Sequence, residues 1–182
     1  TPGAQVVTDC AEAFNAMMKR WQKKQLHVWT VAEATLFPQA SQIRYALGSG
    51  STDHATETFY QTEIETGGEA SGQTTLSVVA TTDMTVADFI GIVLDDGSLH
   101  WSTIASKTSS TVTINAALPD SAAAGNAVFN YTTRIVRPLK IVDARRYDIV
   151  SGMETPLAPM LARLDYQALP NKSQTGTINQ AW

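Results

Sequence analysis

The stretch "DFIGIVLDDGSLHWSTIAS", residues 88–106, decides the fold class of this chain. Two runs rich in β-branched and aromatic residues flank the sequence "DDG" at positions 95–97. Because Asp and Gly tolerate the positive φ angles of tight turns, this pattern predicts two antiparallel strands joined by a hairpin turn. The stretch therefore indicates antiparallel β structure in the middle of the chain.

Three more segments extend this predicted sheet, and they are "TTLSVVA" (74–80), "STVTINAAL" (110–118) and "NAVFNYTT" (126–133). Their residues alternate or run with β-formers, and the breaks between them hold Gly, Asp, Pro and Ser, which are typical turn residues. We expect residues 51–133 to form an antiparallel β-barrel or sandwich.

Charge separates this middle region from the rest of the 182-residue chain. Residues 51–133 hold ten acidic side chains and one lysine, a net charge of −9, whereas the flanks hold 12 basic and 7 acidic side chains, a net charge of +5. Such asymmetry usually marks segments with different surroundings. We expect residues 51–133 to be a β domain inserted into a helix-rich host domain that consists of residues 1–50 and 134–182.

The first flank begins with a predicted amphipathic helix. Thr1 is suited to capping and Pro2 to the first helical position. Apolar residues then recur at the three-and-four spacing of one buried face: Val6, Val7, Cys10, Phe14, Met17, Met18 and Trp21. Four basic residues gather near its end: Lys19, Arg20, Lys23 and Lys24. Cations there complement the helix dipole, and the alternative is a basic rim that faces DNA phosphates in a channel.

The remaining parts of the flanks mix strands and a short helix. Residues 26–36 and 37–48 are predicted to pair as a β-hairpin. Residues 134–148 read as an extended segment that Pro138 restricts to a sheet edge or a strand start, and residues 154–161 as a second extended piece. Residues 162–172 read as a short helix that ends at a proline. The chain as a whole is thus predicted to be α+β.

Composition excludes several classes of protein. With 43% hydrophobic residues the chain can bury a sizeable core, and the single cysteine, Cys10, excludes an internal disulfide framework. Neither CxxC nor HExxH spacing occurs among Cys10 and the three histidines, so we expect no metal and no cofactor. No apolar run reaches the roughly 20 residues that span a bilayer, and no signal peptide is evident. We expect a soluble protein made in the cytoplasm, without membrane contact.

The sequence gives little support for a catalytic group. Asp95 and Asp96 could be a carboxylate pair, but a hairpin tip lacks the walls that shift one pKa, so a turn is the favoured interpretation. A second group, Asp53, His54 and Glu57, is more typical of a solvated link than of a metal site or relay. No nucleophile elbow or phosphate-binding glycine loop is present. We predict that the chain is not an enzyme.

His100 and Trp101 are adjacent and could form a stacking platform for a sugar or a base. Side chains of neighbouring residues in a strand point to opposite faces, so we expect one of the two to belong to the core. A carbohydrate-binding or receptor-binding module stays open as an alternative function, as does a cell-wall hydrolase that uses Asp95, Asp96 or Glu57.

The two flanks together resemble a known family. The resemblance lies in the order of "AEAFNAMMKRWQKKQLHVWTV" (11–31), "LFPQASQIRYALG" (36–48), "RPLKIVDARRYD" (137–148) and "ETPLAPMLARLDYQALPNKSQTGT" (154–177). This order is similar to that of the head-to-tail adaptor proteins of short-tailed bacteriophages, also called head-completion or tail tubular proteins. The inserted β domain departs from the family pattern.

This resemblance implies a structural subunit of the virion neck or tail, made in the host cytoplasm. Such subunits form a ring, usually of about twelve copies, beneath the portal protein, where the ring extends the DNA channel for genome packaging and ejection. The implied partners are further copies of the chain, the portal, the next tail component (a nozzle or tail tube) and, transiently, the phage DNA. Because the family has a C-terminal extension and this sequence opens without Met, we expect further chain beyond both ends.

The resemblance also assigns a role to basic residues of the second flank. The candidate subunit or portal contacts are Arg134, Arg137, Lys140, Arg145, Arg146 and, from the helix, Trp21. Arginine can pair in a bidentate manner with carboxylates of an adjacent subunit, which is the interpretation we favour. Two alternatives stay open: charges that protect solvated strand edges, and direct contact with DNA in the channel.

Overall fold

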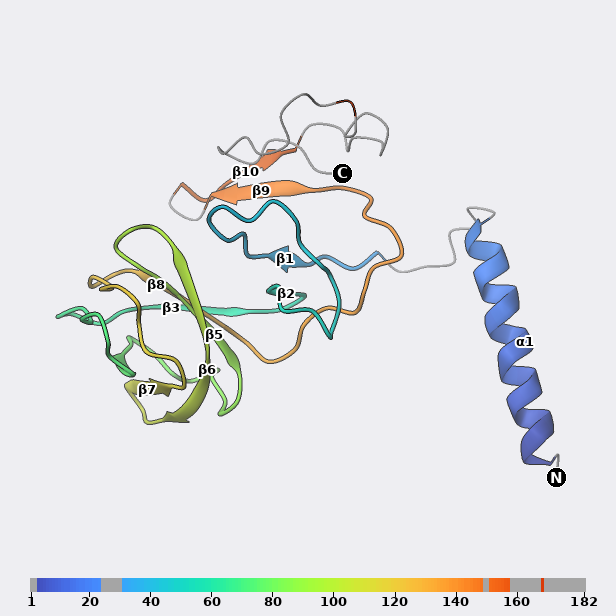
Figure 1. Cartoon of the computed structure of the whole chain (residues 1–182), viewed down its shortest axis with the longest axis horizontal. Helices are drawn as coiled ribbons and strands as arrows, with labels where there is room; N and C mark the ends of the chain where they lie inside the picture. Colours follow the sequence, from blue (N-terminus) through green and yellow to red (C-terminus); the bar gives the residue numbers. More distant parts are fainter. Residues whose placement is uncertain (1–2, 24–30, 149–150, 158–167, 169–182) are drawn as a thin grey trace. The chain divides into compact units, whose positions relative to one another are not determined.

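The computed structural model describes residues 3–23, 31–148, 151–157 and 168 (Figure 1). The chain divides into two compact units, residues 1–33 and residues 34–182. We describe each unit by itself.

The first unit holds helix α1 (Ala4–Lys23). The carbonyl of Gly3 accepts hydrogen bonds from the amides of Val6 and Val7 at 3.0 and 3.4 Å, which starts the first turn. The predicted helix is therefore confirmed, and the predicted cap, Thr1 with Pro2, lies outside the described residues. Within the described residues of this unit nothing packs on the apolar face, and Val7 is 60% exposed, so the predicted burial of that face is not met inside the unit itself.

The second unit is built on a six-stranded antiparallel sheet with the strand order β3-β8-β5-β6-β7-β4. Its strands are β3 (Tyr60–Glu63), β4 (Thr75–Ser77), β5 (Phe89–Val93), β6 (Leu99–Lys107), β7 (Thr111–Ile114) and β8 (Ala127–Tyr131). All four segments predicted as β structure contain strands, and β5 and β6 pair as the hairpin predicted around residues 95–97. Strand β3 has no counterpart in the prediction, because its sequence "YQTE" shows little apolar alternation.

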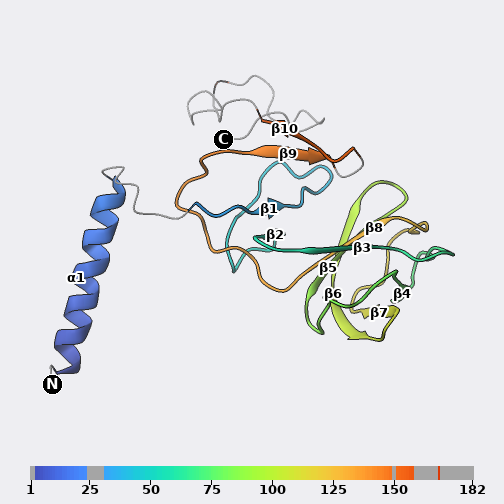
Figure 2. The ribbon, with the colours of Figure 1, turned by 180° about the vertical axis from the view of Figure 1, so that it is seen from behind.

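The sheet curls until its two edges meet (Figures 1 and 2). Just beyond β3, Ile64 forms a bridge with Val78, which follows β4. Two further backbone bonds join these edges, from Glu65 to Ser77 at 2.9 Å and from Val79 to Glu63 at 3.0 Å. Curling removes most of the open edge, and the inward side chains form one apolar core. That core is Ile64, Leu76, Val78, Met84, Ile90, Ile92, Leu94, Ile104, Val112, Ile114, Leu118, Ala122 and Val128.

The remaining strands form two small sheets. Strand β1 (Thr35–Leu36) pairs with β2 (Ala55–Thr56), and β9 (Arg145–Asp148) pairs with β10 (Met153–Pro156). The prediction of a hairpin between residues 26–36 and 37–48 is wrong within the described residues, since the last residues of the first segment pair with β2. The physical reason lies in Phe37, whose burial on the sheet is worth more than a local hairpin in a loop that Pro38 interrupts.

The predicted helix-rich host domain is also wrong in the described part of the chain. Helix α1 is the one helix there, whereas residues 34–50 and 134–157 are extended or irregular and belong to the same compact unit as the sheet. Short apolar runs in these flanks carry no helical period, and their anchor residues pack on the sheet instead. Apart from Ala168, the predicted helix at 162–172 lies outside the described residues. The domain borders at residues 50 and 134 stay a prediction.

Candidate functional site

The outer face of the curled sheet carries a second core, made of aromatic side chains. Phe37 from the first flank lies at its centre, with its ring centroid 5.1 Å from that of Phe129 and 5.2 Å from that of Trp101. Around it pack Tyr131, Phe89, Val93, Leu99 and Ala127. The Phe37–Trp101 pair is edge-on and the Phe37–Phe129 pair is tilted, and aromatic pairs of this kind contribute about 0.5–1.5 kcal/mol beyond the area that they bury. This aromatic anchor, residues 37, 89, 101, 129 and 131, ties the first flank to the sheet.

Trp101 is partly buried and is contacted by several residues. A Cβ atom placed on Gly91, directly across in β5, would lie 2.8 Å from the Trp101 ring, so only glycine permits this packing. The imidazole of His54 stacks on the indole at a centroid distance of 3.8 Å. The indole Nε1 donates to the side-chain oxygen of Gln39 at 2.7 Å when that carboxamide is turned toward it. The expectation that His100 or Trp101 belongs to the core is confirmed, and Trp101 is not a free stacking platform.

His54 is a structural base rather than a metal ligand or relay. Its Nδ1 lies 2.7 Å from the hydroxyl of Tyr131. Burial, with a smaller contribution from the positive charge of Arg134, lowers the pKa of His54 to about 4, although Asp53 acts in the opposite direction. Burial likewise raises the pKa of Tyr131. The imidazole is therefore neutral at pH 7 and bonds the tyrosine without a charge.

Asp53 and Glu57, which the sequence places near His54, lie in different environments. The carboxylate of Asp53 accepts hydrogen bonds from the side chain of Gln42, at 2.6 Å, and from the amide of Ala46, which pins the loop of the first flank. Glu57 is exposed. In the described ranges no three His, Cys, Asp or Glu side chains are arranged to hold a metal ion.

Arg134, the first of the candidate interface residues, lies against its own chain. Its guanidinium carbon is 4.0 Å from the centroid of the Phe89 ring, and its Nε donates to the carbonyl of Asp53 at 3.1 Å. A cation over an aromatic face is worth about 0.5–2 kcal/mol, depending on how far it is desolvated. Arg134 thus joins the second flank to the aromatic anchor, a role that sequence reasoning missed because Phe89 is 45 residues away.

Asp95 and Asp96 form the predicted turn. Asp95 accepts hydrogen bonds from the Ser121 hydroxyl at 2.7 Å, the Ala123 amide at 2.7 Å and the Asn126 side chain at 2.9 Å. These bonds, that of Ser121 first, lower the pKa of Asp95, and bonding to Ser98 lowers the pKa of Asp96. Gly97 supplies the positive φ of 80°. A general acid would need the opposite shift, so these hydrogen bonds explain both residues without catalysis.

Most of the described side chains of the second flank are exposed to solvent. We call residues 136–148 and 151–157 the exposed flank. Its apolar side chains face solvent, with Val136 78%, Leu139 77% and Val142 72% exposed. Among its basic residues, Arg137, Lys140, Arg145 and Arg146 are all exposed. In strands β9 and β10 every residue is exposed.

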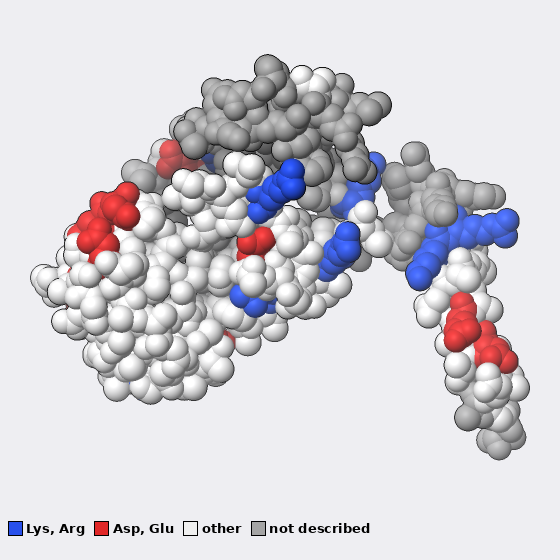
Figure 3. Space-filling view, in the orientation of Figure 1, with Lys and Arg blue, Asp and Glu red and all other residues white. Residues whose placement is uncertain are grey.

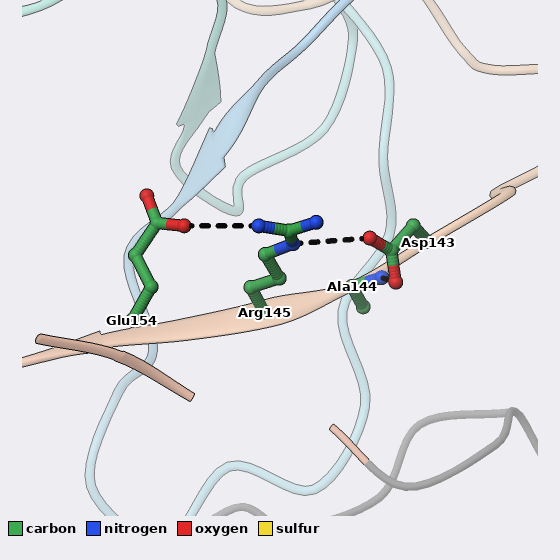
Figure 4. Close-up of polar contacts among 4 residues, drawn as sticks. All are labelled: Asp143, Ala144, Arg145 and Glu154. Carbon is green, nitrogen blue, oxygen red and sulfur yellow. Dashed lines mark hydrogen bonds and ion pairs between the residues drawn. The ribbon is translucent and has the colours of Figure 1, made fainter. Parts of the chain in front are cut away.

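One of these arginines already has partners in the chain. Arg145 Nε lies 3.1 Å from a carboxylate oxygen of Asp143, and its Nη1 lies 3.3 Å from Glu154 across the β9–β10 pair (Figure 4). Both bonds raise the pKa of Arg145, that to Asp143 more. Within the described residues no carboxylate pairs with Arg137, Lys140 or Arg146, so these three carry the unmatched charge of the exposed flank.

The candidate residues of the first flank lie in the other unit. Trp21 is 37% exposed on α1, and Lys19 and Arg20 are exposed near its end. Helix α1 ends at Lys23, and Lys24 lies outside the described residues.

A shallow hollow lies along strand β3, a place that the sequence did not single out. Its volume is about 390 Å³, and its lining is Tyr60, Gln61, Thr62, Glu63, Val79 and Ala80. Mixed polar and apolar side chains line it, and it opens to solvent where the two edges of the curled sheet approach each other.

Comparisons with protein-family models, with curated proteins and with solved structures found no match to this chain. Among its described helices, none combines the length and apolar character that crossing a membrane requires.

Proposed function

We propose that this chain is a structural virion subunit, a head-to-tail adaptor that forms a ring under a phage portal. In this role it extends the DNA channel and provides the attachment site for the tail. The exposed flank is the observation that carries the proposal. It combines exposed apolar side chains with the charges of Arg137, Lys140 and Arg146, with which no carboxylate of the described residues forms an ion pair.

Contact between protein subunits suits such a surface. Apolar groups are buried at the centre of an interface while arginines at its rim pair with carboxylates, and Arg is enriched at interfaces. A ring repeats the same contact between every pair of neighbouring subunits, so that interactions which are weak individually stabilise the whole assembly. The curled sheet is less suited to such a contact, because the side chains of its core and of its aromatic anchor already pack against one another within the chain.

The exposed flank suits protein better than DNA. It also holds Asp143, Asp148 and Glu154, so its charge is mixed rather than uniformly basic. A phosphate backbone favours uninterrupted positive charge. The channel-facing role therefore falls to the basic end of α1, with Lys19 and Arg20 exposed there.

Mass photometry of the whole chain, alone and mixed with its portal protein, tests this proposal. We expect rings of about twelve copies, alone or on the portal, that dissociate as salt rises. The variant Arg137→Glu/Arg146→Glu should abolish the rings. As a matched control, Arg44→Glu reverses an exposed charge outside the exposed flank and should leave them intact. A chain that stays monomeric with and without the portal at all salt concentrations would overturn the proposal.

A carbohydrate-binding or receptor-binding module is the second candidate, and the hollow along β3 favours it. Carbohydrate sites combine an aromatic side chain with amide and carboxylate groups, as Tyr60, Gln61 and Glu63 do here. A glycan array read with the whole chain tests it, with Gln61→Ala expected to remove the signal and Gln73→Ala, outside the hollow, to retain it. An array without signal for the unaltered chain would exclude this candidate.

A further inference from the structure

The exposed apolar side chains of helix α1 follow a heptad repeat. Val7, Phe14 and Trp21 are seven residues apart, and Cys10 and Met17 lie between them, so the spacing alternates between three and four. This is the a and d pattern of a coiled-coil seam. Four of these side chains are 37–60% exposed and Cys10 is exposed as well, so the seam has no partner within its own described unit.

The residues beside the seam widen it. Val6 and Ala13 border it on one side and Ala11 and Met18 on the other, whereas Glu12 and Lys19 lie on the opposite face of the helix. An isolated helix of 20 residues is marginal in water, and most helical stability in proteins comes from covering such an apolar face. Helix α1 is therefore expected to be stabilised by a second apolar surface that covers this face.

We propose that α1 pairs with α1 of a second copy of this chain in an antiparallel coiled coil. Charge selects this partner and this direction. Asp9 and Glu12 lie in the first half of the helix, and Lys19 and Arg20 in the second half, as the red and blue groups on α1 show (Figure 3). An antiparallel pair sets each acidic half beside a basic half and opposes the two helix dipoles, whereas a parallel pair sets like beside like.

The sizes of the side chains in the seam also favour the antiparallel direction. When Phe14 of one helix faces Met17 of the second copy, Cys10 faces Trp21 of the second copy, so the smallest seam residue meets the largest. In this register Asp9 lies two residues, or about 3 Å along the axis, from Arg20 of the second copy, on the same side of the seam. Asp9 accepts a hydrogen bond from Gln5 at 3.0 Å, and no cation within the described chain pairs with its charge.

Such a pair differs from a ring contact and does not rest on the proposed adaptor function. The antiparallel pair is isologous, so it closes with two copies and cannot propagate around a ring. It is a form of the free protein in which the apolar face of α1 is covered.

Sedimentation equilibrium of the whole chain tests the pair by charge exchange. We expect dimers for the unaltered protein. Asp9→Arg and Arg20→Asp should each raise the dimer dissociation constant at least tenfold, because each sets like charges together twice, and the double variant should restore it. Lys19→Asp makes the same change as Arg20→Asp on the face away from the seam, so it should shift the constant less than threefold. A monomeric unaltered chain, or a double variant no better than either single one, would overturn the pair.

The natural Cys10 tests the direction independently. In the antiparallel register the two Cys10 residues lie 11 residues apart along the axis, about 16 Å, which no disulfide can bridge. Mild oxidation should therefore leave the dimer without a covalent link, and a rapid disulfide dimer would indicate a parallel pair and overturn the proposal. The unaltered chain can also be tested on the portal, where rings that form from a protein with no free dimers would contradict the pair and leave the adaptor function standing.

Discussion

The curled sheet and the β9–β10 hairpin are both antiparallel β structure, yet they differ in the burial of their side chains and in the number of their strands. Strand β5 buries Ile90 and Ile92 completely, whereas all eight residues of β9 and β10 are exposed. The sheet has six strands that close on themselves, and the hairpin has two strands, which are marginal by themselves in water. Backbone hydrogen bonds are common to both.

The side chains, and not the backbone pairing, account for this difference in burial. Val, Ile and Leu alternate in the sheet and build a core, while the side chains of the hairpin, among them Arg, Tyr, Met and Glu, are exposed. The sheet holds the apolar core of the unit, and the hairpin contributes no residue to that core. Four measurements test whether the sheet and the hairpin differ in stability in this way.

The largest effect is expected from a cavity in the sheet. Ile90→Ala removes a fully buried side chain from the central strand β5 and should lower the free energy of unfolding by about 3 kcal/mol, as measured by urea titration. Val142→Ala, on the exposed flank, is the matched control and should change it by less than about 0.5 kcal/mol. Equal losses at the two positions would show that the exposed flank is part of the folded core.

A smaller effect is expected where the sheet packs on Trp101. Gly91→Ala adds a Cβ atom 2.8 Å from an indole that Phe37 and His54 hold in place, which should cost about 1–3 kcal/mol. Gly50→Ala has open space around the new atom and serves as the control in thermal melts. Melting temperatures that agree for the two variants would mean that the indole moves freely.

The next effect depends on pH and concerns His54. Since its folded pKa of about 4 is below the ordinary value of 6.5, the unfolded chain binds the proton more readily. The stability that His54 contributes is complete above pH 6.5 and is lost as pH falls toward 4. With allowance for partial solvent screening, we expect a loss of roughly 1–2 kcal/mol over that range.

His54→Phe provides the comparison, because it keeps a ring against Trp101 and removes the titration. The pH dependence of the urea midpoint between pH 6.5 and 4 should become flatter in this variant. An unchanged slope would assign the acid sensitivity to other groups.

The smallest effect is expected at the hairpin. Arg145→Ala removes both ion pairs of Figure 4, but all three side chains are more than half exposed, so the thermal midpoint should not move measurably. Differential scanning calorimetry of the two proteins at low salt checks this. A clear fall in the midpoint would place the hairpin within the cooperative core.

Much of the sheet could be predicted from the sequence because its signals are local. The period-two runs at 74–80, 88–106, 110–118 and 126–133 each contain strands, and Asp95 to Gly97 form the turn that their chemistry predicts. Strand β3 was missed, since "YQTE" has no apolar alternation and pairs only because β8 lies beside it. The hairpin at 26–48 was predicted wrongly because the local pattern does not show where Phe37 is buried.

For the residues of the candidate site, too, local features could be predicted and long-range contacts could not. The charges of the exposed flank can be read from the sequence, but their pairing cannot. The structure places Arg134 on Phe89 and Arg145 beside Asp143, whereas Arg137 and Arg146 form no ion pair with another described residue. His54 looked like part of a polar link and turned out to be a neutral base against Trp101. Its role depends on contacts 47 and 77 residues away in the chain.

Local patterns were enough to predict the period of the strands, the turn at Asp95 to Gly97, the helix at the start and the asymmetry of charge, since each depends on residues a few positions apart. No local pattern showed that the sheet closes between Ile64 and Val78, that Phe37 and Arg134 bring both flanks onto the aromatic anchor, or that the exposed flank is not covered by the described residues of its unit. Those features are long-range. Burial depends on which distant side chains meet, and no local pattern records that.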